Sequence, residues 1–206
     1  MSANTQARTP ATRRLSGPER REQLLDVTKA IVDERGFHAV SIDAVAREAG
    51  ISRPIVYEHF GTLPGLLEAL VERELARALT QLAAILPGDL AEGDPREILL
   101  AAQRAYLDAA RADPATWRLV LMPPEGAPAM LREQIAAGRA AVVAYLAKAM
   151  RGGLFREPPP DDELAAHMLA TSSDEAVRLM LADPERYPPE RLLAFSAWFL
   201  DQVVAR

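Results

Sequence analysis

The sequence predicts an all-α protein, and three observations lead to that fold class. Apolar side chains recur at intervals of three and four residues over several long segments, which is the period of an amphipathic helix. Proline and glycine stand mostly at the ends of those segments. No stretch alternates apolar and polar residues as a half-buried strand would.

The first 17 residues are expected to form a flexible basic arm. Residues 1–17 are polar, show no helical period and carry three arginines without an acidic side chain. An arm of this kind can reach DNA phosphates or a minor groove. Arg13 and Arg14 are therefore candidate DNA contacts.

Residues 18–62 are expected to form a domain of three helices. The first has Pro18 in its first turn and ends at Gly36, which is a typical C-cap. Ser41 is a good N-cap for the second helix, which stops at Gly50. A third, short helix runs to about His59.

Residues 63–206 are expected to form a helical body. Asp-Pro pairs at 94, 113 and 183 each place a capping carboxylate ahead of a first-turn proline. Two glycines at 152 and 153 and three prolines at 158–160 mark a loop. We expect helices near residues 64–86, 95–111, 114–122, 127–151, 161–182 and 188–205.

Composition and charge exclude several classes of protein. The chain has no cysteine, which excludes disulfides and thiolate metal sites, and its three histidines are scattered, so neither a metal nor another cofactor is expected. No apolar run is long enough to cross a membrane and no secretory signal stands at the start, so we expect a cytoplasmic protein without a membrane partner. Residues 1–62 hold nine basic and eight acidic side chains, whereas the remainder holds 15 and 21. This asymmetry suits polyanion binding by the N-terminal part alone.

The segment from Ile42 to Tyr57 has the features of a helix-turn-helix. Two short helices that cross steeply need a small residue where their backbones approach, and Ala46 supplies it. The turn needs a residue that accepts positive φ, and Gly50 supplies that. Ile51 and Val56 are apolar anchors for the second helix.

A helical hairpin without a role in nucleic-acid binding is the alternative, since an Ala-x-x-x-Gly pair occurs in many helical proteins. Two features favour DNA binding. The second helix, which Ser52 can cap, is short and displays Arg53, Tyr57 and His59 instead of a full apolar face. It also follows a basic arm.

These residues resemble the N-terminal domain of the TetR family of transcriptional regulators. The similarity extends from about Arg20 to Leu70 and is carried by the run from Val40 to Ser52 and by Tyr57, His59 and Phe60 in a Tyr-x-His-Phe element. It implies a DNA-binding regulator with a helical domain for dimerisation and ligand sensing. The sequence carries no phosphate-binding glycine loop, no Gly-x-Ser-x-Gly nucleophile motif and no metal-ligand cluster, so the protein is not expected to be an enzyme.

The resemblance implies roles for individual residues at the DNA. Arg53 would read guanine O6 and N7 at the start of the recognition helix. Pro54 and Ile55 would meet base edges, although Ile55 is alternatively a core residue. The resemblance further implies phosphate contacts from Ser41, Tyr57 and His59. Ser52, at the N-terminus of the helix that would face the major groove, is a further candidate DNA contact.

One position departs from the family pattern. A lysine that contacts the DNA backbone usually follows the His-Phe pair, whereas this chain has Leu63 and then Pro64. The missing charge puts that phosphate contact in doubt, and the hydroxyl of Thr62 is the candidate to replace it. His59 also has an alternative role as a packed, hydrogen-bonded side chain.

The last two helices are expected to form a homodimer interface. The helix near 188–205 is apolar around much of its circumference, and the helix near 161–182 carries a stripe of small residues that permits close approach. The resemblance places a four-helix dimer interface here. The alternative is that both helices complete the core of one chain. A two-fold dimer would read a palindromic operator.

A cavity for a small, largely apolar effector is expected in the body because of the resemblance. Candidate wall residues combine aromatic and polar groups, and each is alternatively a core residue: Gln103, Tyr106, Trp117, Leu121, Tyr145, His167 and Thr171. The acidic pair Asp174-Glu175 is expected on a solvated face.

The sequence therefore predicts a ligand-released repressor that binds double-stranded operator DNA. The alternatives are a helical protein-interaction module and a TetR-like activator without small-molecule sensing.

Overall fold

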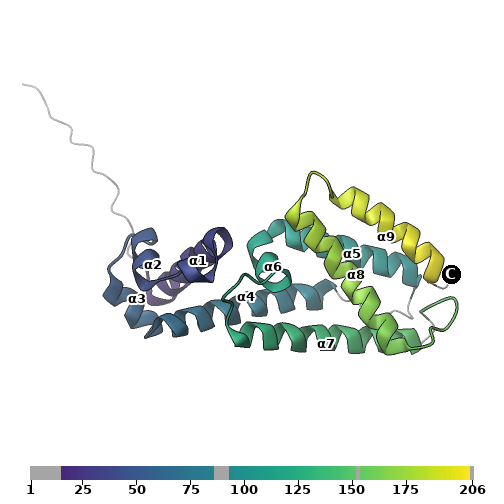
Figure 1. Ribbon diagram of the computed structural model, residues 1–206, viewed down its shortest axis with the longest axis horizontal. Helices are drawn as coiled ribbons and strands as arrows, with labels where there is room; N and C mark the ends of the chain where they lie inside the picture. Colours follow the sequence, from purple (N-terminus) through teal and green to yellow (C-terminus); the bar gives the residue numbers. More distant parts are fainter. Residues whose placement is uncertain (1–14, 86–92, 152–153, 205–206) are drawn as a thin grey trace, which may run out of the picture.

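The computed structural model describes residues 15–85, 93–151 and 154–204. Over these residues the chain is all-α, as predicted; it contains no strand beyond an isolated antiparallel bridge between Phe155 and Val204. Figure 1 shows an elongated molecule with the first helices at one end and the last helix at the other. The elements are α1 (Gly17–Arg35), the 3-10 turn η1 (Phe37–Ala39), α2 (Ile42–Glu48), α3 (Arg53–Phe60), α4 (Leu63–Ile85), α5 (Pro95–Ala112), α6 (Pro114–Leu121), α7 (Ala129–Arg151), α8 (Asp162–Ala182) and α9 (Pro189–Val203).

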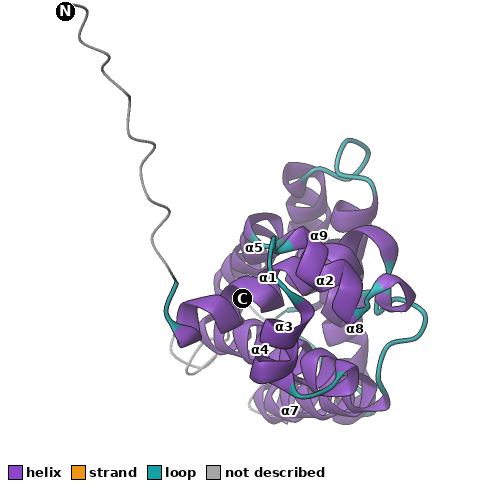
Figure 2. Cartoon of the chain, turned by 90° about the vertical axis from the view of Figure 1, so that its left-hand side faces the viewer, coloured by secondary structure: helices purple, strands orange, loops and turns teal. Residues whose placement is uncertain are grey.

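The N-terminal domain is built around the apolar faces of its short helices. Leu24 and Ile31 of α1, Val45 of α2 and Val56 of α3 are buried in one cluster. The first half of α4 belongs to the same cluster through Leu66 and other buried side chains. Figure 2 looks at this end of the molecule, where α1, α2 and α3 lie around the start of α4. Packing therefore runs across the expected domain boundary at residues 62 and 63.

Most helix ends follow the sequence signals. Asp94 and Asp113 cap α5 and α6 by accepting hydrogen bonds from the backbone of Arg96 and Thr116. Asp183 was expected to act in the same way, but it is the C-cap of α8 and accepts from the backbone N–H of Arg186, 3.0 Å away, in a single turn. Residues 184–187 form a turn, and α9 begins only at Pro189.

The body places α5 against α8 and α9, and α7 against α8. Ala166 and Ala170 of α8 are buried in a cluster with Ala147 and Met150 of α7. The small side chains of α8 therefore permit close packing within the chain, which was the alternative to their expected place in a dimer interface. Among the described helices, none has the length and apolar character needed to cross a membrane.

Candidate functional site

The turn between α2 and α3 has the geometry of a helix-turn-helix. Gly50 adopts φ +67°, a conformation that side-chain-bearing residues rarely take, as the sequence predicted. Ala46 is buried, and its carbonyl accepts a hydrogen bond from Ile51 N at 3.0 Å. Val56 is fully buried and holds α3 against the rest of the domain. The start and outer face of α3 are consequently fixed relative to α2.

The opposite face of α3 is open to solvent. The Arg53 side chain is 66% exposed and Tyr57 is 50% exposed. Pro54 is also exposed, while Ile55 is half-buried. A helix that hides one apolar anchor and displays an arginine and a tyrosine can contact a polyanion without unfolding.

The serines at the two helix starts behave differently. Ser41 caps α2 by accepting from Ala44 N at 3.1 Å. Ser52 stands at the N-cap of α3 but its side chain makes no capping hydrogen bond. The reason is that Pro54 has no N–H and the N–H of Ile55 donates to the Ser52 carbonyl. The prediction that the Ser52 hydroxyl caps the recognition helix was therefore wrong.

The end of α3 and the turn that follows it use polar groups for contacts within the chain. The carbonyl of His59 accepts from Arg21 Nη1 at 2.9 Å, and the same guanidinium lies over the Phe60 ring, 4.5 Å from its centroid. Thr62 Oγ1 accepts from Gly65 N at 3.1 Å. Leu63 packs against the N-terminal core cluster, which explains why an apolar residue suits this position. Arg13 and Arg14 lie outside the described residues.

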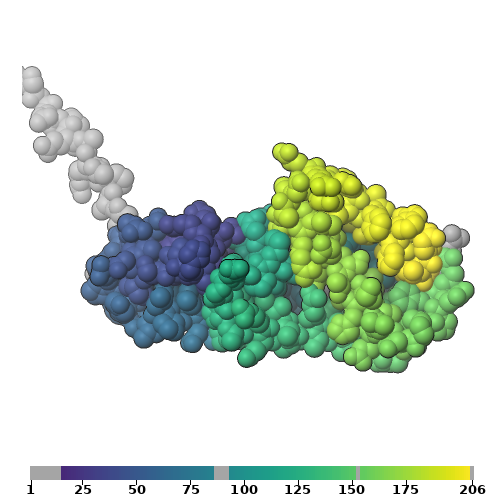
Figure 3. All heavy atoms as spheres, viewed as in Figure 1, coloured from purple at the N-terminus to yellow at the C-terminus, as the bar shows by residue number. Residues whose placement is uncertain are grey.

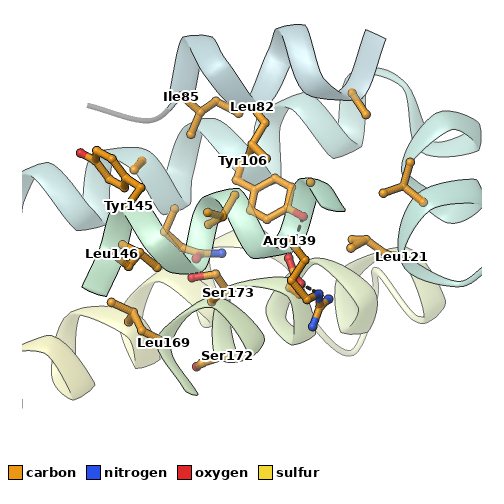
Figure 4. A pocket seen from close by; sticks show the side chains of 18 of the residues that line it. Leu82, Ile85, Tyr106, Leu121, Arg139, Tyr145, Leu146, Leu169, Ser172 and Ser173 are labelled. Atoms are coloured by element: carbon orange, nitrogen blue, oxygen red, sulfur yellow. Dashed lines mark hydrogen bonds and ion pairs between the residues drawn. The ribbon is translucent and has the colours of Figure 1, made fainter. Parts of the chain in front are cut away.

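A cavity of about 170 Å³ lies in the body. Its wall is formed by the second half of α4 together with α5, α6, α7, α8 and α9. Figure 4 shows its labelled side chains, with the rings of Tyr106 and Tyr145 and the aliphatic groups of Leu82, Ile85 and Leu146 facing the same space. Most of the wall is apolar, so the cavity suits a molecule that is itself largely apolar.

The structure brings five of the seven candidate wall residues to this cavity: Gln103, Tyr106, Trp117, Leu121 and Tyr145. His167 and Thr171 are not among the wall residues and are exposed instead. These two share a face of α8 with Leu164 and Met168, whereas Leu169 and Ser173 on the neighbouring face line the cavity. The prediction that His167 and Thr171 line the cavity was therefore wrong.

Two charged side chains that were not predicted at the cavity, Arg139 and Asp174, lie in its wall beside Tyr106. Tyr106 donates a hydrogen bond to Asp174 at 2.9 Å, and Arg139 forms an ion pair with the same carboxylate. Burial, followed by the neighbouring charge of Asp174, raises the pKa of Tyr106 well above its ordinary value, so its phenol stays protonated. Asp174 was expected in solvent, but it is half-buried because it follows Ala170 by four residues and precedes Val177 by three on the inner face of α8.

A charged cluster joins the N-terminal domain to the body. Lys29 of α1 lies 3.0 Å from the Glu74 carboxylate of α4 and 2.7 Å from that of Asp113, which caps α6. Its ammonium also donates to Thr116 Oγ1 at 2.7 Å, and Thr116 in turn hydrogen-bonds to Glu74. Glu74 is fully buried. Three elements from both parts of the chain therefore meet at one paired set of charges.

The pKa of Glu74 shows that this pairing compensates for burial. Burial raises that pKa. Hydrogen bonds from Thr116 and Lys29 and the charges of Lys29 and Arg73 lower it by more than burial raises it, so the net pKa lies below the ordinary value. The pKa of Asp113 is lowered in the same way. Both carboxylates are therefore ionised at neutral pH and hold Lys29 in place.

Helix α6 has contacts on both sides. Arg118 makes two hydrogen bonds of 2.7 Å with Asp33 of α1, and Thr116 belongs to the charged cluster. Trp117, between them in the sequence, lines the cavity and donates from Nε1 to Gln81 of α4 at 2.9 Å. One short helix thus contacts the cavity and the N-terminal domain with successive side chains.

Together these features define a class of protein: a helix-turn-helix DNA-binding domain joined to a helical body with a cavity. Residues 24–70 match the family of bacterial regulatory proteins called the tetR family. The N-terminal domain is therefore a TetR-type DNA-binding domain, and the resemblance found in the sequence is confirmed.

Curated relatives agree with this family. The HTH-type transcriptional activator FasR of Mycolicibacterium smegmatis is 33% identical over 107 residues, which are 52% of this chain and 48% of that protein. The HTH-type transcriptional regulator BetI of Yersinia pestis is 37% identical over 106 residues, 48% of this chain and 52% of that protein. The matches thus span about half the length of these relatives. Both are named as regulators, in agreement with the prediction that the chain is not an enzyme.

Solved structures extend the similarity over the whole fold. A TetR-like transcriptional regulator from Rhodococcus sp. RHA1 has a TM-score of 0.67 at 26% identity, covering 90% of this chain and 97% of that one. A putative transcriptional regulator from Saccharomonospora viridis in complex with choline has a TM-score of 0.69 at 21% identity, covering 92% and 100%. The SmeT–triclosan complex has a TM-score of 0.68 at 24% identity, covering 90% and 91%. The chain has the fold of TetR-like regulators in both of its parts.

Proposed function

We propose that this protein is a homodimeric transcriptional repressor that binds a palindromic operator and is released by a small, largely apolar effector. The observation that carries the DNA-binding role is the solvent-exposed face of α3, on which Arg53 and Tyr57 project from a helix that Val56 anchors. Ser41 and the free hydroxyl of Ser52 are further candidate phosphate contacts, as are His59 and Thr62. Pro54 and Ile55 would meet base edges.

A dimer is supported by an apolar face on the last two helices. Leu164 and Met168 of α8 are 58% and 66% exposed, and Phe195 and Trp198 of α9 are 61% and 57% exposed. Figure 3 shows α8 and α9 together on the surface, in yellow-green and yellow, at the end away from the N-terminal domain. Side chains of this size are usually covered. A second copy placed on this face by a two-fold axis would bury them and present two recognition helices to successive major grooves.

The effector role rests on the cavity in the body. Proteins of the same fold are solved with small molecules, namely choline and triclosan, which shows that similar folds hold ligands of different chemistry. In this chain the apolar wall and the ring pair Tyr106 and Trp117, whose centroids are 4.8 Å apart, suit an apolar molecule.

Two helices can transmit occupation of the cavity to the DNA-binding domain. Helix α4 is continuous from Leu63, next to α3, to Ile85 in the cavity wall. Helix α6 contacts the cavity through Trp117 and α1 through Arg118. A ligand that favours another position of either helix shifts the dimer towards a spacing that no longer fits both half-sites. A hundredfold loss of operator affinity requires roughly 2.7 kcal/mol of coupling.

An activator is the second candidate for the mode of regulation. The name of the FasR relative, a transcriptional activator, supports it. The position of the operator relative to a promoter decides between the two modes, and a reporter carrying the operator upstream of or within the promoter distinguishes them.

The test of the DNA-binding role is selection of bound duplexes from a random pool, followed by titration of the selected operator with wild-type protein and Arg53→Ala. We expect the variant to lose preference for the selected sequence while its mass in solution stays that of wild type. Arg111→Ala is the matched control, because Arg111 is 67% exposed on α5 and far in sequence from α3. An unchanged sequence preference in Arg53→Ala would contradict the assignment of α3 as the reading helix.

A further inference from the structure

Gln103 is a buried amide in the cavity wall whose donor has no partner. The residue is only 7% exposed and lines the cavity from α5. Its Nε2 is buried and makes no hydrogen bond to any described residue. A buried donor without an acceptor is unfavourable, so proteins usually satisfy such groups. An acceptor atom on a bound molecule would satisfy this one.

Three other hydrogen-bonding groups of the wall have partners within the chain. Trp117 Nε1 donates to Gln81, and the Tyr106 hydroxyl donates to Asp174. Arg139 is paired with the same carboxylate. Serine hydroxyls at 172, 173 and 196 also line the cavity, and each can donate or accept as a ligand requires. Gln103 therefore differs from its neighbours in having a buried donor that nothing in the described chain accepts.

The charge of the wall is balanced. Arg139 and Asp174 are the only charged side chains among the described residues that line the cavity, and they neutralise each other. A cation or an anion in this space would lose its hydration without gaining a free counter-charge. The wall therefore favours an uncharged molecule.

The volume of the cavity sets the size of the molecule. At about 170 Å³ it is close to the roughly 150 Å³ of an engineered apolar cavity that binds benzene. The edge-to-face pair of Tyr106 and Trp117 adds a surface suited to a ring. One ring with a short substituent fits this space.

We propose that the effector cavity takes a compact, uncharged, mainly apolar molecule with one hydrogen-bond acceptor, such as a ketone or ester oxygen, that accepts from Gln103 Nε2. This inference rests on the proposed function, since it specifies the effector class of the same cavity. The proposal predicts that neutral molecules with an acceptor bind more tightly than anions, cations and pure hydrocarbons of the same size.

The test uses four probes of one size and different chemistry, titrated calorimetrically into the full chain without DNA. Acetophenone is neutral with an acceptor, ethylbenzene lacks the acceptor, benzoate is an anion and 1-phenylethylamine is a cation at pH 7. We expect acetophenone to bind about 3- to 10-fold more tightly than ethylbenzene, which is the usual net effect of one hydrogen bond. Benzoate and the amine should bind at least about 10-fold more weakly than acetophenone.

The variant Gln103→Met keeps the length of the side chain and removes the donor. It should bind acetophenone and ethylbenzene equally, with ethylbenzene affinity no lower than in wild type. Gln23→Met on α1 makes the same chemical change away from the cavity and should keep the wild-type ratio. Thermal unfolding of both variants checks that each is folded. Because methionine removes the buried donor that has no partner, Gln103→Met should be at least as stable as wild type.

Three results would overturn the proposal: benzoate or the amine binding as tightly as acetophenone, an acetophenone preference that survives in Gln103→Met, or no binding of any probe. A separate titration of operator DNA with and without acetophenone tests the proposed function. Acetophenone binding that depends on Gln103 but leaves operator affinity unchanged would refute effector control by this class and leave the ligand assignment intact.

Discussion

Arg53, the first residue of the recognition helix, forms an ion pair with Asp43 in the first turn of α2. Both side chains are more than half exposed, so the pair contributes little to stability. Its consequence lies at the DNA-binding surface. The carboxylate holds the guanidinium of the main base-reading candidate, and it also places a negative charge where DNA phosphates would approach.

Asp43→Asn should therefore raise non-specific DNA affinity and lower specificity. Removing the carboxylate frees Arg53 to pair with any phosphate and removes a repulsive charge, so we expect about a 3- to 10-fold gain on random duplex and a smaller gain on the selected operator. Fluorescence anisotropy with both duplexes at two salt concentrations measures the ratio. Asp108→Asn is the matched control, since Asp108 also pairs with an arginine on an exposed surface. Equal gains in both variants would reduce the effect to net charge.

Gly65→Ala should displace the start of α4 from α3. A Cβ at Gly65 would lie 2.5 Å from the carbonyl oxygen of Phe60, which is backbone and cannot rotate away. We expect a destabilisation of about 1–3 kcal/mol and a loss of operator affinity, measured by thermal unfolding and DNA titration. In Gly138→Ala the new Cβ meets only the end of the Leu79 side chain at 3.4 Å, so that variant should be as stable as wild type or more stable. Equal melting temperatures of Gly65→Ala and wild type would contradict the predicted clash.

The helix-turn-helix was predictable because its determinants are local. Ala46 and Gly50 are four residues apart. The short turn requires a residue with positive φ, and a glycine at that position in the sequence indicates it. The exposure of Arg53 and Tyr57 follows from the burial of Val56, which fixes the phase of an eight-residue helix. No knowledge of the rest of the fold is needed for these inferences.

The cavity was less predictable because it depends on the phase of long helices and on distant partners. His167 and Thr171 were predicted to line the cavity, whereas Asp174 was predicted to face solvent. All three predictions were wrong because the sequence alone did not determine which face of α8 points inward. Lys29 and Thr116, which are 87 residues apart, meet only in the folded chain. Periodicity predicts that a helix has a buried face, but opposing helices decide what that face meets.

Acidification should destabilise the protein through the charged cluster of Lys29, Glu74 and Asp113. Glu74 and Asp113 have folded pKa values below their ordinary values of 4.5 and 3.8, so their stabilising contribution is present above those values and is lost as the pH falls through the lower folded pKa. We expect the melting temperature to fall from pH 5 towards pH 3.

In Glu74→Gln this part of the pH dependence should be smaller, and the melting temperature at pH 7 should be about 6–12 °C lower, since a buried pair is broken. Thermal unfolding followed by circular dichroism between pH 3 and 7 measures both effects. Glu125→Gln, in an exposed loop, should follow the wild-type curve. Parallel curves for Glu74→Gln and wild type would show that Glu74 makes no contribution to the acid transition.

Introducing charged side chains on the exposed face of α8 and α9 should convert the dimer into a folded monomer. Met168 and Trp198 are more than half exposed within one chain, so Met168→Glu with Trp198→Glu leaves the core intact but opposes burial of that face by a second copy. We expect half the wild-type mass by light scattering, an unchanged helical spectrum and operator affinity at least about 100-fold lower, because one half-site is lost. Ala144→Glu, exposed on α7, should remain dimeric. A double variant that keeps the wild-type mass would place the interface elsewhere.

Breaking the contact between α6 and α1 should weaken communication more than binding. Arg118 and Asp33 form a bidentate ion pair outside the cavity, so Arg118→Gln should leave acetophenone affinity unchanged. If α6 transmits occupation of the cavity, the ratio of operator affinities without and with saturating acetophenone should fall about 3- to 30-fold, which is the usual range for a residue within a coupling path. Arg96→Gln removes a comparable pair with Asp201 at the surface of the body and should keep the wild-type ratio. A ratio that is unchanged in Arg118→Gln would leave α4, which is continuous from the recognition helix to the cavity wall, as the sole route.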